Sequence, residues 1–161
     1  MKARRIFIAV SVLIIGARVL FMAAGGAVFM AERIKRDAPP QIHTESDPIC
    51  HHFPELPEAT EIQWCSQTSD GMGLTTIKLY FFAFYDYDVS TELQDMGMEG
   101  EGEHIELYFV PDGINADEKW RLVENAGLVF QTGIKDTRKL YANAYINETG
   151  TILYVEAIGE G

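Results

Sequence analysis

The sequence has few of the residues that mark the common catalytic and nucleic-acid-binding classes. It contains two cysteines, four histidines and 13 Lys and Arg residues against 24 Asp and Glu residues. It has no phosphate-binding glycine pattern, no His-Glu-x-x-His and no Gly-x-Ser-x-Gly, so the enzyme classes that these motifs define are excluded. The net charge of −11 predicts repulsion of nucleic acid. We therefore expect a protein that is not an enzyme, needs no cofactor and binds no nucleic acid.

The charge is divided unevenly along the chain. Residues 1–36 carry seven basic residues and one acidic residue, a net charge of +6, whereas residues 37–161 carry six basic and 23 acidic residues, a net charge of −17. The basic part contains the apolar run Ile6–Ala31, whose only charge is Arg18. As a helix this run is about 39 Å long, more than the roughly 30 Å of bilayer hydrocarbon. It predicts a single-pass membrane anchor in contact with lipid.

The anchor has two possible fates. A retained helix would place the short basic N-terminus in the cytoplasm and the acidic remainder outside it, with Arg18 snorkelling or paired with another helix. Alternatively, residues 1–27 are a signal peptide that is cleaved in the patch Ala23–Ala27, which leaves a secreted or periplasmic domain. Arg18 fits poorly between an apolar signal core and a cleavage site, which favours the retained anchor.

Small residues recur along the apolar run. Most of them repeat at a spacing of seven, which on a helix forms one stripe, with Arg18 roughly opposite its centre. Such a stripe lets a second transmembrane helix approach closely, although alanine and glycine are also simply common in membrane helices. The small residues are Ala9, Gly16, Ala17, Ala23, Ala24, Ala27 and Ala31.

The remainder predicts a Pro-rich linker over residues 37–58 and one acidic α+β domain over residues 59–161. The expected element order is ββαβαβββ, an antiparallel sheet with about two helices on one face. Apolar residues on both sides of Phe81 and Phe82 indicate a central strand that is covered on both faces. The expected strands are Thr60–Gln67, Leu74–Asp86, His104–Pro111, Leu128–Thr132, Lys139–Ile146 and Thr151–Ile158. The expected helices are Asp88–Met96 and Asn115–Gly127, with Lys119–Val123 as a strand the alternative to the second.

Cys50 and Cys65 are the only cysteines. Outside the cytoplasm an even pair predicts a disulfide. This bridge would contribute about 3 kcal/mol by closing a 16-residue loop. The alternative is a Zn or Cu site built from Cys50, His51, His52 and Cys65, with His43 or His104 as further candidates, because thiolate and imidazole suit these metals. The spacing matches no known zinc motif, and adjacent histidines on an extended chain point in opposite directions.

Three weaker patterns complete the sequence. Glu99, Glu101 and Glu103 alternate with glycine, which indicates a solvated acidic loop or, less specifically, a loose Ca²⁺ site. Asn147-Glu148-Thr149 is a glycosylation sequon in a eukaryotic secretory pathway. A hydrolase site that joins His104 to carboxylates of residues 86–103 is a third hypothesis.

The favoured function is a membrane-anchored, extracytoplasmic accessory or interaction module, and the metal-binding domain is its alternative.

Overall fold

The most apolar strand lies in the middle of the sheet, as its sequence predicts. In the computed structural model, β2 (Leu74–Phe84) pairs antiparallel with β1 (Glu61–Gly71) on one side and β5 (Ile152–Glu160) on the other. Phe81 and Phe82 are both fully buried, on opposite faces of the sheet. The central position, the two-sided burial and the β1–β2 hairpin are therefore confirmed.

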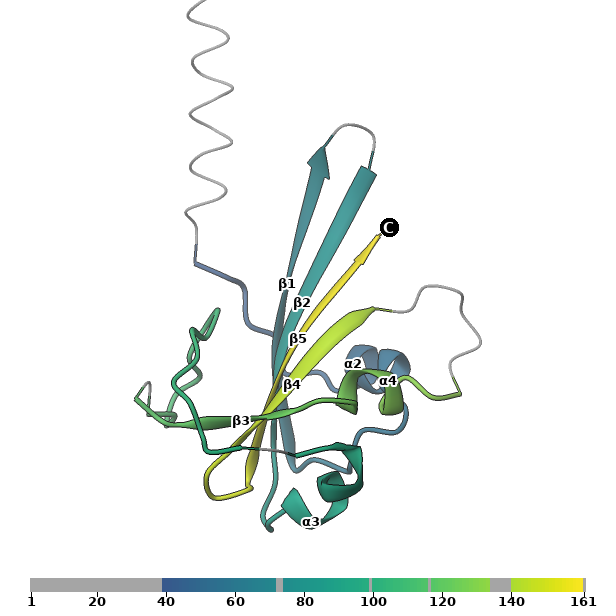
Figure 1. Ribbon diagram of the computed structural model, residues 1–161. Helices are drawn as coiled ribbons and strands as arrows, with labels where there is room; N and C mark the ends of the chain where they lie inside the picture. Colours follow the sequence, from purple (N-terminus) through teal and green to yellow (C-terminus); the bar gives the residue numbers. More distant parts are fainter. Residues whose placement is uncertain (1–38, 72–73, 99, 116, 134–139, 161) are drawn as a thin grey trace, which may run out of the picture. The chain divides into compact units, whose positions relative to one another are not determined.

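The structure describes residues 39–71, 74–98, 100–115, 117–133 and 140–160. They form an antiparallel sheet with the strand order β1-β2-β5-β4-β3 (Figure 1). The compact unit begins at Pro40. No helix among these residues has the length and apolar character needed to cross a membrane. The predicted anchor, including Arg18 and the small-residue stripe, lies outside the described residues.

A second hairpin supplies the other half of the sheet. β4 (Tyr141–Asn147) and β5 pair antiparallel, and the turn between them ends at Gly150, whose φ of 71° favours glycine. β3 (Trp120–Val123) pairs with the second half of β4 and forms the edge of the sheet. The predicted strands Lys139–Ile146 and Thr151–Ile158 are confirmed as β4 and β5.

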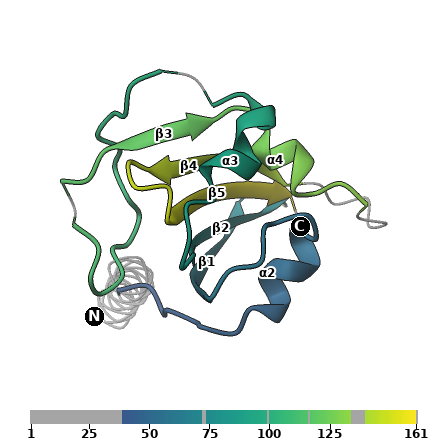
Figure 2. The same cartoon turned by 90° about the horizontal axis from the view of Figure 1, so that it is seen from below.

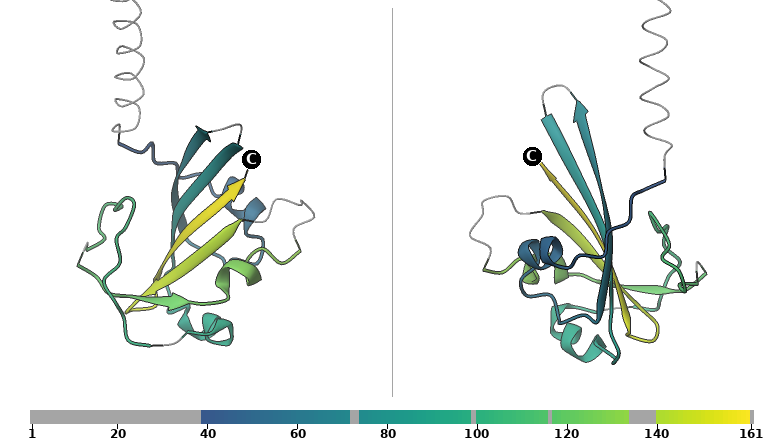
Figure 3. Two further views of the ribbon diagram at one scale, coloured as in Figure 1. Left: turned by 45° about the horizontal axis from the view of Figure 1, so that its top comes forward. Right: turned by 180° about the vertical axis from the view of Figure 1, so that it is seen from behind.

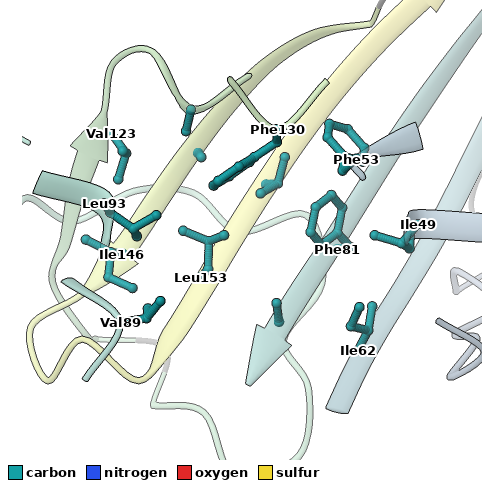
Figure 4. Packing of buried hydrophobic residues seen from close by; sticks show 14 of the residues in the cluster. Ile49, Phe53, Ile62, Phe81, Val89, Leu93, Val123, Phe130, Ile146 and Leu153 are labelled. Carbon is teal, nitrogen blue, oxygen red and sulfur yellow. The ribbon is translucent and has the colours of Figure 1, made fainter. Parts of the chain in front are cut away.

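Short helices cover the first face of the sheet. They are α2 (Asp47–His52), α3 (Ser90–Leu93) with the 3-10 turn η1 (Gln94–Met96), and α4 (Ala126–Val129). Figure 2 shows them on one side of the sheet. Their apolar residues meet β1, β2, β4 and β5 in one core (Figure 4). Residues 47–53 lie in the proposed linker, and they contribute the buried side chains of Ile49 and Phe53 to this core.

The second face is covered by residues 98, 100–115 and 117–119, called the strap here, which lie on the side of the sheet opposite the helices (Figure 2). Phe109 of the strap is buried, and Ile105, Leu107 and Tyr108 pack around it against the sheet. The predicted strand His104–Pro111 is wrong, because this segment alternates apolar and polar residues without forming a ladder with any described strand. Its alternation reflects burial of one side against the sheet.

Two further predictions are corrected. The helix Asn115–Gly127 is absent, because Trp120–Val123 pairs with β4, as the strand alternative had it. Asn115 instead closes a local turn, in which its Oδ1 accepts a hydrogen bond from Asp117 N at 3.1 Å. The predicted strand Leu128–Thr132 is also wrong, because its first residues belong to α4. An added Cβ at Gly127 would lie 2.1 Å from the Ala142 carbonyl oxygen, so this glycine lets α4 pack directly on β4.

Candidate functional site

The second face of the sheet carries a layer of aromatic side chains. Phe82 lies at its centre, and its ring centroid is 4.6 Å from that of Tyr154, 5.1 Å from that of Phe109 and 6.1 Å from that of Trp120. Phe109 comes from the strap, so the strap is fixed to the sheet by ring packing. Edge-to-face and tilted contacts of this kind stabilise beyond the area that they bury.

Tyrosine hydroxyls connect this layer to a single carboxylate. Tyr154 OH donates to Glu156 Oε1 at 2.8 Å and accepts from the backbone N–H of Tyr108 at 3.1 Å. Burial, followed by the hydrogen bond to Glu156 and the charge of that residue, raises the pKa of Tyr154 well above its usual range. Burial, followed by the charge of Glu156, also raises the pKa of Tyr80 and of Tyr145. These tyrosines stay protonated at neutral pH. Tyr154 therefore donates its hydroxyl proton to Glu156, and the same oxygen accepts from Tyr108 N and so helps to position the strap.

A hollow of about 400 Å³ opens where the strap runs beside β3. The strap pairs with β3 at two isolated bridges, Met98 with Val123 and Glu103 with Trp120. Between these bridges the strap has four positions, whereas β3 has two. The strap therefore has two residues more than β3 between the bridges, as in a β-bulge, and Gly100 has a φ of 88°, a conformation that favours glycine. The hollow lies at this mismatch, since Gly100, Glu101 and Gly102 line it.

The hollow combines an apolar floor with an acidic rim. It is lined by Trp120, Leu122 and Tyr145 from the sheet, by Ile105, and by the strap residues Gly100, Glu101, Gly102 and Glu103. Glu101 and Glu103 are exposed, and neither has an ion-pair partner within the described residues. A third carboxylate and a lysine are close, because an added Cβ at Gly102 would lie 3.6 Å from Glu148 Oε1 and 3.0 Å from Lys119 Cβ.

Trp120 contributes an unused donor to this site. Its side chain is 1% exposed, and its Nε1 has no hydrogen-bond partner in the described part of the chain. A buried N–H without an acceptor costs about 1–3 kcal/mol, so most such groups in folded proteins are paired. An acceptor that reached Trp120 would remove this cost.

Exposed apolar side chains extend from the hollow along the same face. Leu122 on β3 is 41% exposed, Tyr141 on β4 is 86% exposed and Ile158 on β5 is 47% exposed. Tyr141 and Ile158 are direct cross-strand partners, and Leu122 is the partner of Tyr145. Figure 3 shows that these are neighbouring strands. The three side chains and Tyr145 lie on one face of the sheet, called the open face here, where Asn143 and Glu156 stand between Tyr145 and the pair Tyr141 and Ile158.

A second, more polar hollow of about 490 Å³ lies beside the β4–β5 turn. Asn147 lines this hollow, is 1% exposed, and forms hydrogen bonds through its amide to other residues around it. Its Nδ2 donates to Glu118 Oε1 and Thr149 Oγ1, each at 2.8 Å, and its Oδ1 accepts from the backbone N–H groups of Thr151 and Ile152. Both amide hydrogens of this sequon residue are therefore in use, so a glycan on Asn147 is incompatible with this turn.

The two cysteines lie on opposite faces of the sheet. Cys65 is fully buried in the aromatic layer of the second face, whereas Cys50 is exposed on α2, which covers the first face. Both are free thiols here, and the disulfide stays a prediction that requires α2 or β1 to move. Burial raises the pKa of the Cys65 thiol to about 11, so it is not a thiolate at neutral pH.

The structure does not bring the candidate metal ligands together. His51 and His52 are neighbours on α2 with ring centroids 5.6 Å apart, but Cys65 faces the other side of the sheet. Within the described ranges, no group of three or more His, Cys, Asp or Glu residues is arranged to hold a metal ion. His43 stacks on Trp64 at the edge of β1, with ring centroids 4.5 Å apart.

The proposed hydrolase arrangement is not assembled either. His104 is exposed and lines neither of the two hollows described above. The site residues that the sequence did not identify are Trp120, Leu122, Tyr145, Tyr141 and Ile158. The alternation of glutamate and glycine at residues 99–103 indicated an acidic loop, but its position beside β3 follows only from the fold.

Comparison with known protein families, with curated proteins and with solved structures finds no match for this chain.

Proposed function

We propose that this protein is a membrane-anchored interaction module that acts outside the cytoplasm and is not an enzyme. The apolar run Ile6–Ala31 and the change in charge after residue 36 support the anchor and its orientation. The described domain supplies the binding surface. We assign partner binding to the open face and to the hollow beside it.

The observation that carries this proposal is the gathering of exposed apolar side chains on three neighbouring strands. Isolated exposed apolar residues are normal on protein surfaces, but several of them on one sheet face, with polar residues between them and a hollow beside them, are typical of interaction sites. Tyr141 is 86% exposed although it lies on a strand whose other face is buried. An aromatic side chain in this position is a common anchor in protein interfaces.

The binding role is tested by photocrosslinking from the full-length protein in the membranes of its own cells. A photoreactive phenylalanine derivative replaces Tyr141 on the open face or, as the matched control, Leu128, which is 73% exposed on α4. We expect one discrete crosslinked species from position 141 and none from position 128. Equal patterns from both positions, or no product from position 141, would overturn the assignment.

The anchor and its orientation are tested separately. After a carbonate wash, we expect the full-length chain to remain in the membrane fraction, because residues 6–31 are apolar enough to hold it there. Protease added to intact cells or spheroplasts is expected to digest residues 40–161. Release by carbonate of a chain that still carries its N-terminus would refute the anchor, and protection from protease until permeabilisation would refute the orientation.

A further inference from the structure

The hollow beside β3 has the chemistry of a receptor for a basic side chain. Its apolar lining includes Leu122, Tyr145 and Trp120, while the exposed Glu101 and Glu103 supply its carboxylates. Arginine matches this combination, because its stem is apolar and its planar guanidinium both stacks on aromatic rings and binds carboxylates. A volume of about 400 Å³ lies within the range of ligand sites, roughly 300–1,000 Å³.

Charge favours the same occupant. Glu101 and Glu103 have no ion-pair partner within the described ranges, and both Glu148 and Lys119 lie beside Gly102. Lys119 is the basic residue that lines the neighbouring polar hollow, where Asp117, Glu118 and Glu148 also lie. The carboxylates around the strap therefore outnumber the cations, and residues 37–161 as a whole carry −17. This negative potential raises the association rate of a cationic partner and favours its binding at this position on the surface.

The unused donor of Trp120 adds a third requirement. A metal cation or an ammonium group offers no acceptor to this N–H, whereas a peptide segment offers a backbone carbonyl oxygen. The nitrogen is sealed from solvent in the present conformation. Gly100 and Gly102 lie in the strap segment that lines the hollow, where glycine gives the backbone the freedom to adjust.

We propose that the hollow binds an arginine side chain of a basic, extended segment of a partner protein. The guanidinium lies between the carboxylates of Glu101 and Glu103, its stem covers Leu122 and Tyr145, and a carbonyl of the segment accepts the hydrogen bond of Trp120. This inference deepens the proposed function and rests on it, since it names the chemistry of the partner that the open face receives.

The test uses Trp120 as the reporter. The chain has two tryptophans, so Trp64→Phe in the full-length protein, solubilised in a nonionic detergent, leaves Trp120 as the only indole. The probes are a capped pentapeptide with a central arginine between glycines and serines, and its citrulline counterpart, which has the same shape without the charge. We expect the arginine peptide to change Trp120 emission saturably and the citrulline peptide to bind at least about tenfold more weakly.

Matched variants identify the carboxylates. Glu101→Gln with Glu103→Gln is expected to remove the preference for arginine over citrulline. Glu55→Gln with Glu58→Gln removes the same amount of charge at exposed positions outside the hollow and should keep the preference. Equal binding of both peptides, or equal loss in both double variants, would overturn the proposal, because the effect would then be nonspecific.

Two controls separate this inference from other readings. Calcium chloride that changes Trp120 emission through Glu101 and Glu103, with no response to the arginine peptide, would show a cation site instead and overturn the proposal. If photocrosslinking from Tyr141 succeeds while the arginine peptide fails, the interaction module stands and only the recognition of arginine is wrong. If both fail, the proposed function fails as well.

Discussion

Asn147 offers the sharpest test of how this domain is held together. Its side chain makes four hydrogen bonds between 2.8 and 3.0 Å: two donated by Nδ2 and two accepted by Oδ1. Asn147→Asp keeps the shape and the two accepted bonds. It removes the donor to Glu118 Oε1 and places a second carboxylate oxygen at hydrogen-bond distance from it.

The expected cost follows from these contacts. A hydrogen bond to a charged group contributes about 1.5–3 kcal/mol, and two carboxylates in contact repel each other in addition. We therefore expect Asn147→Asp to lower the free energy of unfolding by about 3 kcal/mol at pH 7. As the pH falls and one of the two carboxylates takes up a proton, the pair regains a hydrogen bond. The loss relative to the wild type should then shrink.

Urea unfolding of residues 40–161, followed by tryptophan fluorescence at pH 7 and at pH 4, measures both effects. Glu118→Gln in the Asn147→Asp background is the matched rescue, because the glutamine amide donates to the new carboxylate and removes the repulsion. We expect it to recover more than 1 kcal/mol. A loss below about 1 kcal/mol at pH 7, with no rescue by Glu118→Gln, would refute the hydrogen-bond assignment.

Two further predictions follow from buried groups. Iodoacetamide at pH 8 should label Cys50 of the native protein and spare Cys65, because Cys65 is fully buried and its pKa is raised to about 11. Mass spectrometry before and after unfolding in urea measures the labelling of each cysteine. Two unreactive cysteines in the absence of reductant would indicate the predicted disulfide instead. Gly150→Ala should lower the free energy of unfolding by about 2 kcal/mol, because the φ of Gly150 is 71° and an added Cβ would collide with Asp88 Oδ1. That oxygen accepts a hydrogen bond from Ser90 N at the start of α3, so the collision would disturb this contact as well. Equal unfolding midpoints for this variant and the wild type would contradict the close approach.

Local patterns predicted the parts of this fold that local chemistry determines. The run around Phe81 and Phe82 is β-branched and aromatic, and turn residues separate it from β1, so the first hairpin was predictable. The same holds for β4 and β5, which the turn after Asn147 joins. The helix at residues 88–96 was predicted in place, although it is split into α3 and η1, and Gly97 has the left-handed conformation expected after it.

The errors fall where distant residues decide the local structure. Asn115 and Glu118 have the spacing of a helix start, but pairing with β4 makes Trp120–Val123 a strand. Residues 104–111 alternate as a strand does, because Phe109 is buried in the aromatic layer while the segment stays unpaired. The proposed binding site shares this origin, since the hollow depends on the register between the strap and β3. No local pattern encodes that register.

The two extra residues of the strap between its bridges to β3 have a consequence for the history and engineering of this domain. Removing an even number of residues preserves which side chains face inward, so a chain that lacks Gly100 and Glu101 would have segments of equal length between the two bridges. We expect such a segment to pair with β3 along its length and to lose the hollow, so the proposed recognition depends on two residues at the margin of the sheet.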